Sequence, residues 1–121
     1  MNLIAHVEIP VLDLDRAIGF YSGVFGIAFG RTVQVHDSTM AYFPFEPGRD
    51  GASGALAQGP EYAPATSGAV VYFSVDDVGA TLDKAVALGS TILFLASAVT
   101  ERGMVAEISD SEGNRIAIQS R

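Results

Sequence analysis

The first apolar stretch of the chain alternates in the manner of a half-buried strand. Within residues 3–11, Val7 and Ile9 fall on one face, whereas His6 and Glu8 fall on the other. The pattern therefore predicts a strand with an apolar inner face and a polar outer face.

A change to helical spacing follows directly. Asp13 has the chemistry of an N-cap, and the carboxylate of Asp15 suits the positive end of a helix. Gly26 provides the stop. The apolar positions between them recur every three or four residues: Leu14, Ala17, Ile18, Tyr21 and Val24. This pattern predicts an amphipathic helix that ends at Gly26, with Tyr21 in the core.

Shorter apolar stretches separated by turn-forming residues follow the helix. A Pro- and Gly-rich segment at 59–68 then indicates an internal linker. The strands predicted before it cover residues 28–35, 39–45 and 54–58, with a turn at 36–38.

The same order of elements begins again after the linker. A strand at 69–75 leads to Asp76 and Asp77, which are placed to cap a helix that ends at Gly89. Its apolar positions are Val78, Thr81, Leu82, Ala85, Val86 and Leu88. Three more strands are predicted at 91–95, 104–109 and 115–119.

The restart is an internal repeat with an offset of 64 residues. At this offset Leu14 falls on Val78, and Ile18 falls on Leu82. Two copies are too few for a solenoid, but they can form a pseudo-symmetric pair of small sheets that share one core and face a common cleft.

Charge and composition exclude several classes of function. The formal net charge is −7, with six Arg and a single Lys and no basic run, which argues against nucleic-acid binding and against anionic membranes. The absence of Cys excludes thiol chemistry and disulfides. The N-terminus lacks the pattern of a signal peptide, and no apolar stretch is long enough to span a bilayer. We expect a cytoplasmic protein.

Two motifs at the ends of the chain carry a family resemblance. Residues 6–26, HVEIPVLDLDRAIGFYSGVFG, and residues 110–118, DSEGNRIAI, resemble the opening and closing signatures of the vicinal oxygen chelate superfamily. This superfamily includes glyoxalases, bleomycin-resistance proteins and extradiol dioxygenases. The resemblance implies an α+β fold in which two βαβββ-type units form a curved mixed sheet around a central cleft. It implies one domain over 1–121, with repeats at about 1–58 and 69–121 and the linker at 59–68.

The resemblance also implies where a metal would bind. In metal-dependent members, four strands each supply one ligand, and these positions fall here on His6, Val70, Ala117 and either Ala55 or Ala57. Val and Ala offer no donor atom, so we expect no metal and no other cofactor. A displaced site of His6 and Glu8, completed by Glu107, is the remaining metal candidate.

The predicted cleft is aromatic with few polar groups, as small-molecule sites usually are. Tyr72 is the repeat-mate of Glu8 and should face the same cleft. The predicted ligand-binding residues are His6, Glu8, Gln58, Tyr72, Glu107 and Gln119.

Three hypotheses for function follow. The first is a metal-free small-molecule binding protein that resembles the bleomycin-resistance branch. The alternative is a lyase, isomerase or dioxygenase that depends on a metal or on His6 and Glu8, although we assign no catalytic residue. The third is a structural module with a vestigial cleft. The expected partners are a small molecule and a second copy of the chain, in a homodimer with the cleft near the interface.

Overall fold

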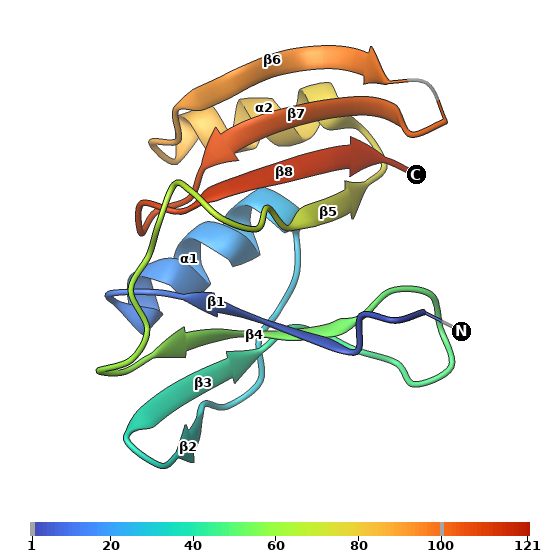
Figure 1. The fold of residues 1–121 in the computed structure, drawn as a ribbon. Helices are drawn as coiled ribbons and strands as arrows, with labels where there is room; N and C mark the ends of the chain where they lie inside the picture. Colours follow the sequence, from blue (N-terminus) through green and yellow to red (C-terminus); the bar gives the residue numbers. More distant parts are fainter. Residues whose placement is uncertain (1, 100) are drawn as a thin grey trace.

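The computed structural model describes residues 2–99 and 101–121 as two modules, each built from a strand, a helix and three further strands. Figure 1 shows the first module below the second. The elements of the first module are β1 (His6–Pro10), α1 (Leu14–Phe25), β2 (Val33–Val35), β3 (Ser38–Tyr42) and β4 (Ser53–Gln58). Those of the second module are β5 (Tyr72–Val75), α2 (Val78–Ala87), β6 (Ile92–Val99), β7 (Gly103–Ser109) and β8 (Arg115–Ser120).

Each module contains one four-stranded sheet, in the order β1-β4-β3-β2 or β5-β8-β7-β6. The first strand of a module runs parallel to the last strand, and the other pairs are antiparallel. Strands β1 and β5 are therefore the facing edges of two sheets that do not close (Figure 1). The predicted α+β architecture of two βαβββ units is confirmed.

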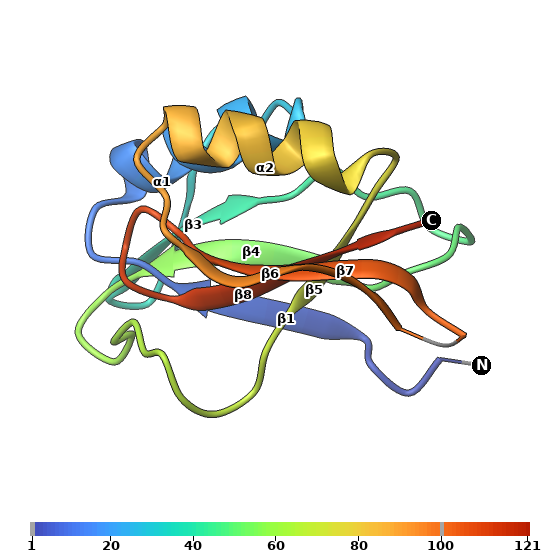
Figure 2. The ribbon, with the colours of Figure 1, turned by 90° about the horizontal axis from the view of Figure 1, so that it is seen from above.

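Both helices lie on the same side of the two sheets (Figure 2). We call the opposite side of each sheet its helix-free face. Among the described residues, no helix combines the length and the apolar character needed to cross a membrane.

The predicted helix boundaries agree with the structure because the caps are local. The side chains of Asp13 and Asp77 accept hydrogen bonds from the backbone N–H groups of Arg16 and Ala80, at 3.1 and 3.0 Å. Gly26 ends α1 in the left-handed conformation, with φ of 64°.

Strand boundaries agree less well because pairing partners decide them. Strand β2 begins at Val33 instead of residue 28, since only three of its residues pair with β3. Phe29, in the segment before it, packs against the core. Strand β6 continues to Val99, beyond the predicted end at Leu95, because it follows β7 through two register shifts.

One apolar core joins the two modules. Tyr21 of α1 is fully buried, and its ring lies 5.7 Å from Phe43 and 5.8 Å from Phe73 between centroids. Phe25 stacks on Phe73 at 4.7 Å. The prediction that Tyr21 belongs to the core is confirmed, and its contact with Phe73 packs the first helix against the second module.

A buried polar cluster in the turn between β7 and β8 adds a second link between the modules. Asp110 accepts a 2.7 Å hydrogen bond from the Tyr21 hydroxyl. Asn114 donates to the carbonyl oxygen of Pro10 at 2.7 Å. Burial, followed by the negative charge of Asp110, raises the pKa of Tyr21 well above its ordinary value. The closing motif therefore holds the end of β1 and the middle of α1.

Glu112 adds further hydrogen bonds to this link. Its side chain is fully covered and accepts from the backbone N–H groups of Leu12 and Asp13, at 2.9 and 2.8 Å. Arg16 donates to both carboxylate oxygens, at 2.8 and 2.9 Å. Burial by itself would raise the pKa of Glu112, but the hydrogen bonds from Arg16 and the backbone outweigh it and lower the pKa to about 2. Glu112 is therefore ionised and holds the two modules together through its hydrogen bonds to Leu12, Asp13 and Arg16. We call this set of contacts the ionised clasp.

Candidate functional site

Alternation along β1 places His6 and Glu8 on the helix-free face of the first sheet. Ile9, which points the other way, belongs to the core beneath the helices. The pairing register sets Glu8 beside Ala55, and Ala55 beside Tyr42. This row therefore carries a carboxylate, a methyl group and a phenol across three adjacent strands.

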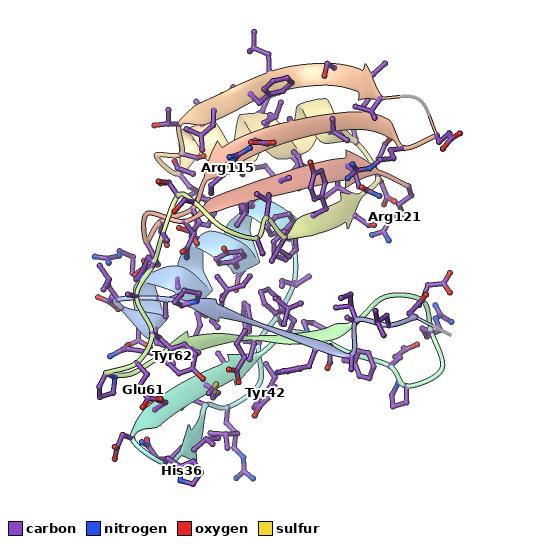
Figure 3. All side chains as sticks on the ribbon, viewed as in Figure 1. His36, Tyr42, Glu61, Tyr62, Arg115 and Arg121 are labelled. Atoms are coloured by element: carbon purple, nitrogen blue, oxygen red, sulfur yellow. The ribbon has the colours of Figure 1, made fainter. Side chains whose placement is uncertain are left out.

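Tyr62 comes from the connection between the modules and lies on this face. Its ring packs against the small cluster formed by Met40, Ala55 and Ala57, and its hydroxyl donates a 2.6 Å hydrogen bond to Oε1 of Glu8. This hydrogen bond is the main reason that the pKa of Tyr62 is raised. Figure 3 shows Tyr62 and Tyr42 near the strands of the first module.

His6 completes the polar group on the first sheet. Its Nδ1 lies 2.7 Å from Oγ of Ser53, and its ring centroid lies 6.2 Å from that of Tyr42. His6 and Glu8 are both exposed, and Tyr42 is 43% exposed. The first sheet therefore presents a carboxylate that is hydrogen-bonded to Tyr62, on the same face as the rings of Tyr42 and His6.

The second sheet carries a closely related row. Tyr72 pairs with Ala117, and Ala117 pairs with Glu107. Here two arginines of the same chain cover the row. The guanidinium of Arg102 lies 4.3 Å from the centre of the Tyr72 ring, and Arg115 forms an ion pair with Glu107. This ion pair raises the pKa of Arg115, chiefly through its hydrogen bond to Glu107.

The residues predicted to line one cleft thus fall into two groups. His6 and Glu8 lie on the first sheet, whereas Tyr72, Glu107 and Gln119 lie on the second. Gln119 accepts a 3.3 Å hydrogen bond from Arg102. The amide oxygen of Gln58 accepts a 2.7 Å hydrogen bond from the backbone N–H of Leu14, which places Gln58 at the start of α1 on the helix side of the sheet.

Sequence reasoning missed Tyr42, Tyr62, Arg102 and Arg115. Tyr62 stands in the segment predicted to be a linker, and an aromatic residue in a Pro- and Gly-rich connection was the available clue. The two arginines had no such clue, because they reach Tyr72 and Glu107 only through strand pairing and a turn.

A separate groove of about 970 Å³ runs between the facing edges of the two sheets. Phe25, Phe43 and Phe73 line it, together with the other residues of β5. Neither His6 nor Glu8 lines this groove, whereas Tyr72 does.

The register resolves which alanine occupies the fourth metal-ligand position. Glu8 pairs with Ala55 as its repeat-mate Tyr72 pairs with Ala117, so Ala55 is the equivalent of Ala117. Within residues 2–99 and 101–121, no three side chains of His, Asp or Glu gather as a metal site would require. In particular, Glu107 does not join His6 and Glu8, because it lies on the other sheet and pairs with Arg115.

Comparison with known proteins agrees with the two end motifs and the paired modules. The model of one family matches residues 3–118. The chain belongs to the Glyoxalase/Bleomycin resistance protein/Dioxygenase superfamily. The resemblance noted in the sequence is thereby confirmed.

The proteins that this chain resembles include a lactoylglutathione lyase and a glyoxalase I. The chain is 29% identical to a lactoylglutathione lyase of Haemophilus influenzae, over 93% of this chain and 88% of that protein. Glyoxalase I from Zea mays matches at 23% identity with a TM-score of 0.75, over 98% of this chain and 44% of that one. The chain thus spans less than half of the maize protein.

A further structure of similar fold is an antibiotic binding protein. TnmS3 of Streptomyces sp. CB03234 is 21% identical, with a TM-score of 0.71 over 99% of this chain and 96% of that one. At this identity the likeness shows the fold alone.

Proposed function

We propose that this protein is a metal-free small-molecule binding protein, close in role to the antibiotic-binding members of its superfamily. The observation that carries the proposal is the chemistry of the four metal-ligand positions, namely His6, Ala55, Val70 and Ala117. Three of these side chains have no donor atom, and a catalytic zinc site normally has about three protein ligands.

The donor set therefore does not fit the divalent metal that the superfamily implies. Lyase and dioxygenase chemistry in this superfamily relies on such a metal, so we derive no catalytic step for this chain. What the first helix-free face does offer is an oriented carboxylate, Glu8, which accepts a hydrogen bond from the half-buried Tyr62 and shares its row with the exposed Tyr42. Apolar and aromatic surroundings with a few placed polar groups suit a small organic ligand.

We further propose that two copies of the chain associate through their helix-free faces. Tyr42, Tyr72 and Phe94 belong to these faces by register and are 43, 38 and 55% exposed. A second copy would cover exposed aromatic surface on these faces and place the cleft near the interface. Light scattering should give twice the monomer mass of 12.7 kDa. A monomeric mass at all working concentrations would contradict this proposal.

Two measurements test the binding function together. Elemental analysis and titration with Ni²⁺, Zn²⁺, Fe²⁺ and Mn²⁺ should give no stoichiometric metal. A screen of natural-product-like compounds by calorimetry should give at least one saturable ligand. Tight binding of one metal that His6→Ala abolishes would overturn the metal-free assignment, and a screen without any saturable ligand would overturn the binding function.

A matched variant shows that the metal assay is sensitive. Replacing the three residues that lack donor atoms, as Ala55→Glu, Val70→His and Ala117→Glu, restores the ligand types that metal-dependent members use. We expect this variant to take up metal under conditions in which the natural chain does not.

A further inference from the structure

The two helix-free faces differ in one respect that points to the kind of ligand. Each carries a row of one carboxylate, one alanine and one tyrosine: Glu8, Ala55 and Tyr42 on the first sheet, and Tyr72, Ala117 and Glu107 on the second. The carboxylate stands on the edge strand β1 in the first row, whereas the tyrosine stands on the edge strand β5 in the second row. The chemical groups of the two rows are nevertheless the same.

On the second sheet, the protein supplies its own cations to this row. Arg102 stacks on Tyr72 at 4.3 Å, and Arg115 pairs with Glu107, whose side chain is 16% exposed. A guanidinium over a phenol ring and a guanidinium on a carboxylate are both favourable contacts. The second row is therefore satisfied within the chain.

On the first sheet, the same groups lack such a partner. Among the described residues, no cationic side chain forms a salt bridge with Glu8 or stacks on Tyr42. The hydrogen bond from Tyr62 holds one carboxylate oxygen of Glu8, and the carboxylate remains exposed. The formal charge of −7 favours the approach of a positive ligand.

We propose that the first sheet binds a small organic cation, with a guanidinium or alkylammonium group placed between the Glu8 carboxylate and the rings of Tyr42 and Tyr62. This inference rests on the proposed binding function and specifies the ligand for the same site. Tyr62 acts here as a positioning residue, since its hydroxyl orients Glu8.

Benzylguanidinium and its uncharged isostere benzylurea form a suitable pair of probes, followed by amide chemical shifts in an NMR titration. We expect the cation to bind at least roughly tenfold more tightly than the urea, with shifts at β1 and Tyr42. Glu8→Gln should remove this preference. Glu61→Gln, which removes the same charge from the residue beside Tyr62, should keep it.

A gain-of-function variant tests the comparison of the two rows. Removing both covering cations, as Arg102→Ala with Arg115→Ala, should expose Tyr72 and Glu107 and create a second cation site with shifts on β5 and β7. A variant that keeps a single site would contradict the equivalence of the rows.

The outcomes separate this inference from the binding function on which it rests. If benzylurea binds as tightly as benzylguanidinium, or if Glu8→Gln behaves like Glu61→Gln, the cation assignment is wrong. The binding function would still stand if the compound screen gave a saturable ligand that Glu8→Gln binds normally. Failure of both the screen and the probe pair would reject the two together.

Discussion

Replacing Glu112 with Gln tests whether the ionised clasp stabilises the joined modules. The substitution keeps the shape and one oxygen acceptor, but it removes the charge and places an amide donor against the donors of Arg16. The folded state lowers the pKa of Glu112 from 4.5 to about 2, which corresponds to a stabilisation of about 3 kcal/mol at neutral pH. Arg16 is half exposed and regains water in the variant. We therefore expect the free energy of unfolding to fall by about 2 to 3 kcal/mol.

The pH dependence gives the sharper test. A carboxyl group whose folded pKa is depressed stabilises the protein above its unfolded pKa, and this contribution disappears as the pH falls through the folded pKa. Urea unfolding should therefore show a difference in the free energy of unfolding between the natural protein and Glu112→Gln. This gap should be full at pH 7 and should shrink from about pH 4.5 towards pH 2.

Glu107→Gln is the matched control for this experiment. It also removes a carboxylate paired with an arginine, but Arg115 is 41% exposed and no backbone N–H group depends on Glu107 for a hydrogen bond among the described contacts. Glu107→Gln should lower the free energy of unfolding by less than about 1 kcal/mol. If Glu112→Gln costs no more than this control at pH 7, or if its gap stays constant down to pH 3, the proposed role of the clasp is wrong.

Two further changes probe single hydrogen bonds by the same urea assay. Tyr21→Phe removes the buried hydroxyl that donates to Asp110 and should lower the free energy of unfolding by about 1 to 2 kcal/mol. A neutral result would mean that the remaining donors, from Glu112 and Asn114, satisfy the carboxylate. Asp13→Ala removes the cap of α1 and should lower the free energy of unfolding by about 1 kcal/mol. Asp15→Ala, two residues on in the first turn, should lower it by less. Equal losses for the two aspartates would argue against specific capping at Asp13.

Local patterns in the sequence determined much of this molecule. Strand alternation, helix spacing and the caps at Asp13 and Asp77 depend on residues within a few positions of one another, so they predicted both helices and the repeat of the modules. Two of the ligand positions implied by the resemblance, Val70 and Ala117, also needed no structure, because no fold gives these side chains a donor atom. The choice between Ala55 and Ala57 needed the strand register.

Tertiary structure alone decided which partners the polar side chains contact. Tyr62 reaches Glu8 across 54 positions, Gln58 caps α1 from 44 positions away, and Glu112 contacts Leu12 across 100. Strand pairing likewise divided the predicted cleft residues between two sheets. Such contacts depend on how the modules pack, and no local periodicity encodes that packing, because each side chain meets a partner whose position is set by the rest of the fold.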